Sequence, residues 1–284
     1  MTGTLYIVAT PLGNLEDISQ RALRILREVD VIACEDTRRT RVLLSFFGIK
    51  TRTVSYHEHN ERARAEQLCD QMESGKNVAL VSDAGTPLLS DPGFRIVQAA
   101  IEREIPVVPI PGATAFVAAL VASGLPSDQF FFAGFLPARA NARRAKLEEL
   151  RAVPGTLVFY EAPHRIAATL KAALEVLGNR RAVVARELTK LHEEIARGTL
   201  LELTKKFSND APPRGEIVLV ISGAADDPIG GGESSPGNLV ERVSELESGG
   251  WDAKTALKQA AREFGMKRAE AYRLLVAQKN RRSK

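Results

Sequence analysis

The sequence of 284 residues is poor in the groups that build metal centres and disulfide frameworks. It has two cysteines, Cys34 and Cys69, and four histidines, and none of them has a spacing typical of metal ligands. We therefore expect no bound metal. Two isolated cysteines fit a reducing compartment, which favours a cytoplasmic protein. No apolar run approaches the length of a membrane span, and the N-terminus lacks the pattern of a signal peptide, so we expect no membrane contact.

The sequence also lacks the common nucleotide-binding and hydrolase motifs. No GxGxxG follows the first predicted strand, and GxxxxGK[ST] and GxSxG are absent. Dinucleotide, P-loop and esterase-type functions therefore have no motif support.

The positive charge of the chain is concentrated near its C-terminus. Residues 236–284 hold 11 Lys and Arg against 6 Asp and Glu, whereas the remaining 235 residues hold 28 against 29. Such a basic segment indicates a polyanionic partner for the tail and not for the whole body.

The first part of the chain alternates short apolar runs with segments of helical periodicity, which predicts a parallel sheet of βα units. Strands are expected at residues 4–9, 29–33, 51–56, 78–81 and 106–110, and helices at 18–28, 37–47, 61–74 and 96–101. Right-handed crossovers bring the carboxyl ends of these strands to one edge. That edge collects the loops at Pro11, Glu35, His57, Asp83 and Pro111.

The sequence VALVSDAGTPLLSDPG, residues 78–93, combines a buried strand with an acidic residue and a glycine turn. Ligands of open α/β sheets bind outside the carboxyl ends of strands, so this turn is a candidate binding loop. An ordinary βα connection would also contain these residue types, and both interpretations stay open. We expect Asp91 to cap the next helix, with Pro92 at its first position.

The second part of the chain predicts another α/β domain, with a mixed sheet. Its strands are expected at residues 130–135, 156–160, 182–186 and 216–222, its helices at 140–151 and 164–177, and a strand pair or one long irregular strand at 193–203. We place domain boundaries at 1–124 and 125–222, a flexible linker at 223–237 and a helical extension at 238–284. In the extension, Asn238 is the expected cap of its first helix, and helices at 253–264 and 267–278 resemble a helix-turn-helix unit, although a small solubilising bundle fits equally well.

Seven segments together resemble one enzyme family. They are ATPLGNLED (9–17), CEDTRRT (34–40), HEHNE (57–61), VSDAGTPLLSDPG (81–93), PGATA (111–115), FYEAPHR (159–165) and ARELTKLHEE (185–194). The combination is similar to the 16S ribosomal RNA cytidine 2′-O-methyltransferases of the tetrapyrrole-methylase superfamily. The resemblance implies two α/β domains with S-adenosylmethionine in the cleft between them. The first-strand loop reads PLGNLED, where porphyrin-modifying relatives have roughly GxGxGD, which favours a different acceptor.

The same resemblance assigns residues to the cofactor. Those expected to contact it are Pro11, Leu12, Gly13, Asp83, Gly85, Thr86, Ala113, Thr114, Ala115, Tyr160, Glu161, Leu188, Glu216 and Ile217. It also implies a homodimer and a substrate in the small ribosomal subunit.

A ribose hydroxyl is a poor nucleophile, so we expect a proton acceptor near it. His57 and Glu161 are the candidates, although each fits a hydrogen-bonding or capping role as well. For contact with RNA phosphates we expect two groups of cations, namely Arg38, Arg39 and Arg41 beside the cleft, and Lys267, Arg268 and Arg273 in the tail. A solvated basic patch explains the first group equally well. Two other functions stay open, methylation of a porphyrin-like molecule and a nucleic-acid-binding regulator.

Overall fold

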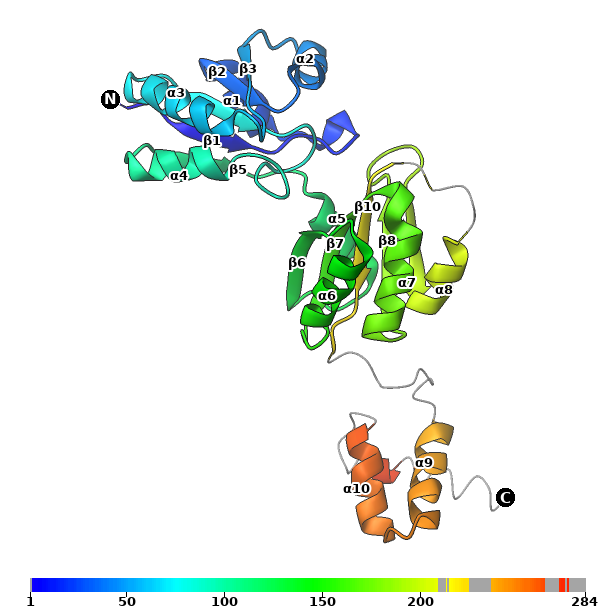
Figure 1. The fold of residues 1–284 in the computed structure, drawn as a ribbon. Helices are drawn as coiled ribbons and strands as arrows, with labels where there is room; N and C mark the ends of the chain where they lie inside the picture. Colours follow the sequence, from blue (N-terminus) through cyan, green and yellow to red (C-terminus); the bar gives the residue numbers. More distant parts are fainter. Residues whose placement is uncertain are drawn as a thin grey trace. The chain divides into compact units, whose positions relative to one another are not determined.

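The computed structural model describes residues 2–208, 213, 215–224, 236–263, 271–273 and 275. The chain divides into two compact units, Met1–Ser222 and Gly223–Lys284 (Figure 1). The first unit contains two five-stranded sheets. The predicted boundary at residue 124 falls inside this unit and stays a prediction.

The first sheet is entirely parallel, as the alternating pattern predicts. Its strands are β1 (Leu5–Val8), β2 (Val31–Cys34), β3 (Arg52–Ser55), β4 (Val78–Val81) and β5 (Val107–Ile110), in the order β3-β2-β4-β1-β5. Helices α1 (Gln20–Glu28) and α2 (Thr37–Phe46) cover one face, and α3 (Glu61–Glu73) and α4 (Phe94–Glu102) the other. A short helix, η1 (Leu15–Asp17), precedes α1. Because both faces are buried, the strands read as apolar runs and not as alternating patterns.

The start of α4 differs from the prediction. The helix begins at Phe94, and its cap is Gly93 with φ of 144°. Asp91 is therefore not the cap, and Pro92 is not the first helical residue. The chain first passes through left-handed conformations at Leu88 and Ser90, with φ of 72° and 71°. Because of these two turns the helix begins three residues after Asp91, which therefore lies in the loop.

The second sheet is mixed, as predicted. Its strands are β6 (Phe130–Phe135), β7 (Thr156–Glu161), β8 (Arg181–Arg186), β9 (Glu194–Thr199) and β10 (Ile217–Ile221), in the order β6-β7-β10-β8-β9. Only β6 and β7 pair in parallel within this sheet. Helices α6 (Ala140–Leu150), α7 (Ile166–Leu177) and α8 (Leu200–Lys206) pack on one face, and the short helix η2 (Pro163–Arg165) precedes α7.

The other face of the second sheet is covered by α5 (Ala115–Ser123), which follows directly from the last strand of the first sheet. Phe116 and Leu120 of this helix pack against Val158 and Val220. The helix therefore starts beside the first sheet and contributes its buried face to the second. It links the loop after β5 to both layers.

Residues 193–203 form neither the predicted strand pair nor one long irregular strand. Only β9 is extended, and α8 begins at Leu200. Thr199 caps this helix by accepting a hydrogen bond from the Glu202 amide, while the Glu202 side chain accepts one from the Thr199 amide. The capping box ends the strand and starts the helix.

The second unit has its own small apolar core. It contains α9 (Pro236–Ser248) and α10 (Ala253–Glu263), and residues 271–273 and 275 are also helical. Leu239, Val243, Leu257, Ala260 and Ala271 are buried together, which confirms the predicted inner faces of the first two helices. Asn238 is the third residue of α9, so its prediction as the cap is wrong. Residues 225–235, which form most of the predicted linker, and Lys267 and Arg268 lie outside the described residues.

Candidate active site

Two loops of the first sheet are tied together at its carboxyl edge. The loop after β1 and the turn after β4 form an isolated antiparallel bridge between Thr10 and Gly85. Thr10 N donates to Gly85 O at 2.8 Å, and Gly85 N donates to Thr10 O at 3.0 Å. The Thr10 hydroxyl also donates to Ser82 O at 3.1 Å. Because β1 and β4 are neighbours in the sheet, these bonds fix the two loops as one surface.

A cavity of about 340 Å³ lies between this surface and the second sheet. It is lined by Leu12, Ala84, Gly85, Thr86, Leu89, Ser90, Asp91, Ala115, Phe135, Tyr160, Glu161, Ala162, Pro163, Leu188, Gly215, Glu216, Ile217 and Val218. We call it the central cavity. Its lining includes nine of the residues predicted to contact a cofactor, namely Leu12, Gly85, Thr86, Ala115, Tyr160, Glu161, Leu188, Glu216 and Ile217. The fold therefore brings together residues that lie as far apart in the chain as Leu12 and Ile217.

A second hollow of about 240 Å³, which we call the side hollow, adjoins the central cavity and shares Leu12, Ala84 and Glu216 with it. Three more predicted residues line it, Pro11, Gly13 and Asp83. The two remaining predicted cofactor residues, Ala113 and Thr114, line neither space, but both form hydrogen bonds with Thr86. The Thr86 hydroxyl lies 3.1 Å from Ala113 O and 2.7 Å from the Thr114 hydroxyl. All the predicted residues thus lie at or directly behind these two spaces.

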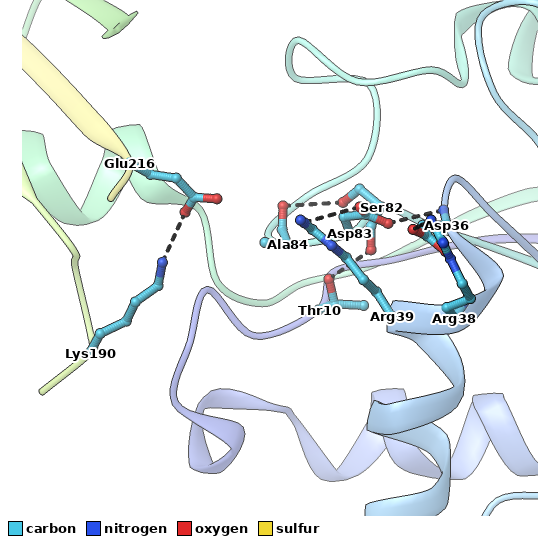
Figure 2. A network of polar contacts seen from close by, with 9 residues as sticks. All are labelled: Thr10, Asp36, Arg38, Arg39, Ser82, Asp83, Ala84, Lys190 and Glu216. Atoms are coloured by element: carbon cyan, nitrogen blue, oxygen red, sulfur yellow. Dashed lines mark hydrogen bonds and ion pairs between the residues drawn. The ribbon is translucent and has the colours of Figure 1, made fainter. Parts of the chain in front are cut away.

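The side hollow is bordered by a chain of charged contacts at the start of α2 (Figure 2). Asp83 accepts a hydrogen bond from the Asp36 amide at 3.1 Å and pairs with Arg39 at 3.2 Å. Asp36 caps the helix through the Arg38 amide and pairs with the Arg38 guanidinium, both at 2.8 Å. The Arg38 contact lowers the pKa of Asp36 to about 2. These carboxylates offset the cost of placing arginines in the first helical turn.

The third arginine of this helix, Arg41, lies elsewhere. It lines a separate hollow together with Leu44, Ser45 and the chain from Ile49 to Thr53. Arg39 alone of the three predicted arginines lines the side hollow.

The two lobes of the first unit, each built around one of its sheets, meet where the loop after β1 lies against Thr189 and Lys190. Within the second lobe, the Lys190 ammonium lies 2.9 Å from Glu187 and 3.4 Å from Glu216, and it lowers the pKa of Glu187. A side chain on Gly13 would come within 2.4 Å of the Lys190 side chain. The Asn14 amide, one residue later, donates to the Thr189 hydroxyl at 3.2 Å. The loop after β1 therefore touches the second lobe directly.

The two predicted proton acceptors have different surroundings. Glu161 is buried, and its carboxylate accepts from the Thr169 hydroxyl at 2.5 Å and the Ala162 amide at 2.8 Å and lies 3.2 Å from Arg165 Nε. His57 lines neither space, and its Nε2 lies 3.3 Å from Asn60 Nδ2. The catalytic role of both residues stays a prediction.

Comparison with known proteins identifies the family. Residues 4–204 match the model of the Tetrapyrrole (Corrin/Porphyrin) Methylases. The chain belongs to this family.

Relatives of this methylase are similar over nearly their whole length. The chain is 46% identical over 276 residues to Ribosomal RNA small subunit methyltransferase I of Halalkalibacterium halodurans, covering 96% of this chain and 94% of the relative. It is 47% identical over 280 residues to the protein of the same name from Mesorhizobium japonicum, covering 97% and 92%. Since these relatives are methyltransferases, this methylase is an enzyme.

Solved structures confirm the two-lobed methylase fold. Uroporphyrin-III C-methyl transferase from Thermus thermophilus, complexed with S-adenosylhomocysteine, is 20% identical with a TM-score of 0.55, and the match covers 78% of this chain and 97% of that one. Cobalt precorrin-4 methyltransferase is 19% identical with a TM-score of 0.58, covering 79% and 96%. At these identities the likeness establishes the fold only.

Sequence reasoning missed one acid of the methylase site. Asp91 lines the central cavity. Burial, and after it the negative charge of Glu35, raises the pKa of Asp91 to about 6. The sequence SDPG is typical of a helix start and therefore predicts Asp91 as a cap. One sequence signal points to the site: Asp91 follows the buried strand β4 by ten residues, and the carboxyl end of β4 borders the cleft.

Two further observations bear on metals and membranes. Within the described part of the chain, no three His, Cys, Asp or Glu side chains gather in a way that would hold a metal ion. None of the helices in that part is long and apolar enough to cross a bilayer.

Proposed function

We propose that this enzyme transfers the methyl group of S-adenosylmethionine to the ribose 2′-hydroxyl of a cytidine in 16S ribosomal RNA. The observation that carries the proposal is the central cavity, whose lining includes nine predicted cofactor residues contributed by both lobes. The near full-length similarity to the ribosomal RNA small subunit methyltransferases supports the RNA substrate. The likeness to tetrapyrrole enzymes concerns the fold alone, so a porphyrin-like substrate has weaker support.

The lining of the central cavity fits such a cofactor. Its walls carry apolar side chains, including Leu12, Leu188 and Ile217, which suit an adenine ring. The acidic side chains of Asp91 and Glu216 also line it and would attract a cationic sulfonium. A Cβ at Gly85 would lie 3.2 Å from the Leu12 side chain, so the glycine avoids crowding between two residues of the cavity lining.

The cofactor supplies an activated methyl group that is transferred by in-line displacement. The residues of the chain hold the reacting atoms in position. The Thr10–Gly85 bridge holds the turn after β4, which lines the cavity, in place. The Thr86 hydroxyl connects this turn to the residues before α5 by hydrogen bonds. Rigid placement of the reacting atoms supplies much of the acceleration in such a reaction.

The RNA is expected to approach along the side hollow and the second unit. Arg39 borders the side hollow, and Arg38 is exposed beside it. Arg273 is exposed on the second unit. Contacts of these cations with phosphates would give the binding a strong dependence on salt.

The enzyme is proposed to act as a homodimer in the cytoplasm. Exposed apolar side chains on α5 and β6, namely Val121 and Phe130, support a protein interface on the side of the second sheet that α5 covers. A monomeric mass in light scattering at micromolar concentration would contradict the dimer.

The proposed function is tested by transfer of labelled methyl groups. The purified enzyme is incubated with labelled S-adenosylmethionine and small ribosomal subunits that lack the modification, and the labelled nucleoside is then mapped. We expect one 2′-O-methylated cytidine in the 16S RNA. Label on a porphyrinogen offered in parallel, and none on the subunits, would contradict the proposal.

A further inference from the structure

Four ionisable side chains line the central cavity, Asp91, Tyr160, Glu161 and Glu216. Three of them are poorly suited to accept a proton. The carboxylate of Glu161 is occupied by the hydrogen bonds described above. Glu216 pairs with Lys190, and its side chain is 68% exposed. Burial raises the pKa of Tyr160 to about 12, so its phenol stays protonated at neutral pH.

Asp91 differs from the other three in its contacts. Among the ion pairs of the described residues none includes Asp91, although its side chain lines the cavity. Its place depends on backbone conformation. The left-handed residues Leu88 and Ser90 turn the chain before it, and Gly93, with φ of 144°, caps the helix that begins at Phe94. The carboxylate is therefore held in a loop and is not used as a helix cap.

The second lobe comes close to this loop. Strand β6 has an irregular register between Phe132 and Phe135, and Gly134 within it has φ of 63°. A side chain at Gly134 would come within 3.0 Å of the Ser90 hydroxyl. Phe135, next to it, lines the cavity with Asp91. Asp91 thus lies where the lobes approach one another.

Resting on the proposed function, we propose that Asp91 is the catalytic residue that takes the proton from the acceptor ribose hydroxyl. The ribose O–H bond breaks and its proton passes to the Asp91 carboxylate. The ribose oxygen forms the new bond to the methyl carbon, and the electron pair of the broken carbon–sulfur bond stays on sulfur. The carboxylic acid then returns its proton to water.

The charges around Asp91 suit this role. After burial, the carboxylate of Glu35 has the largest effect, and Asp83 and Glu216 act in the same direction, whereas the Ser82 hydroxyl favours the ionised form. Together they raise the pKa to about 6, so the group is ionised at neutral pH yet more basic than an exposed aspartate. Burial raises the pKa of Glu35, Asp83 and Asp36 raise it further, and Arg39 and His57 act in the opposite direction.

The experiment compares the wild type, Asp91→Asn and a control, Asp128→Asn, in which an exposed acid outside the cavity is changed. Turnover with small subunits is measured at saturating substrates from pH 5 to 9. We expect Asp91→Asn to lower turnover at least ~100-fold, the ordinary size of a general-base effect. Binding of S-adenosylhomocysteine, measured by calorimetry, should change less than about threefold, because the substitution is isosteric. Wild type and control should lose about tenfold in turnover per pH unit below pH 6.

A second readout needs no activity. The pKa of the Asp91 carboxyl group rises on folding from 3.8 to about 6, so the folded state binds this proton more tightly than the unfolded state does. The resulting stabilisation of the folded state is fully present below pH 3.8. This contribution is lost as the pH rises through 6. Asp91→Asn should therefore unfold at a higher temperature than the wild type at pH 7.5, and the difference should be much smaller at pH 4 and vanish below pH 3.8.

The outcomes separate the inference from the proposed function. If the wild type does not methylate small subunits, the proposed function fails. If it does, and Asp91→Asn keeps wild-type turnover with the same pH profile, Asp91 is not the proton acceptor. Equal losses in turnover and in cofactor affinity would also overturn the inference, because they indicate a structural role.

Discussion

At the scale of single residues, the site depends on a backbone contact that a glycine permits. Gly85 has φ of 85°, and it forms the bridge to Thr10 while lying against Leu12. Gly85→Ala should destabilise the fold by about 2 kcal/mol, because the left-handed conformation costs about 1 kcal/mol and crowding against Leu12 adds a similar amount. Urea unfolding measures the loss. Affinity for S-adenosylhomocysteine should fall as well.

A matched control separates conformation from crowding. Gly124, the left-handed residue after α5, has φ of 75°, and a Cβ there would meet nothing within 4 Å. Gly124→Ala should therefore cost only about 1 kcal/mol and leave cofactor affinity unchanged. Equal stabilities and equal affinities of the two variants would show that the contact with Leu12 is unimportant.

At the scale of elements, hydrophobic periodicity predicted most helices and strands, because buried faces impose it. The errors fall where short polar interactions decide the structure. Residues 193–203 contain apolar residues that suit a strand, but the Thr199–Glu202 capping box starts a helix. Likewise Gly93, and not Asp91, is the cap of α4, because the left-handed residues Leu88 and Ser90 turn the chain before Asp91. Such backbone choices leave little trace in the apolar pattern.

The capping box predicts a measurable effect on stability. Thr199→Ala removes the side-chain acceptor of the Glu202 amide, which should lower the free energy of unfolding by about 1 kcal/mol. Thr199→Ser keeps the hydroxyl and should lose only a few tenths of this amount. Urea unfolding curves of the three proteins test the assignment. A serine variant as unstable as the alanine variant would contradict the capping role.

At the scale of the whole molecule, the sequence predicted two α/β sheets and most of the helices and strands along the chain, and family resemblance supplied the residues of the cleft. The sequence alone did not show which distant segments lie next to one another. The central cavity depends on which strands are neighbours and on α5, which begins beside the first sheet and packs on the second. Asp91 was recognised as a residue of the site only from this arrangement of segments. Contacts between distant segments follow from packing, and local patterns do not determine them.

The division into two units predicts separable roles. Among the residues that the structure describes, none beyond Ser222 belongs to the hydrophobic clusters of the first unit. A chain of residues 1–222 should therefore fold and bind S-adenosylhomocysteine normally. Its affinity for 16S RNA should be weaker and less dependent on salt, because the basic second unit is missing. Each lost phosphate contact should reduce the slope of log affinity against log salt by about 0.7 to 0.9.

A full-length variant separates the charge of the second unit from its mere presence. Lys254, Lys258 and Arg273 are exposed there, and their joint replacement by glutamine leaves the apolar core of that unit in place. This variant should reproduce much of the weaker RNA binding and the flatter salt dependence of the truncated chain. If it binds RNA as the wild type does while the truncated chain does not, these cations are not the contacts. If both bind as the wild type does at every salt concentration, the second unit has no part in RNA binding.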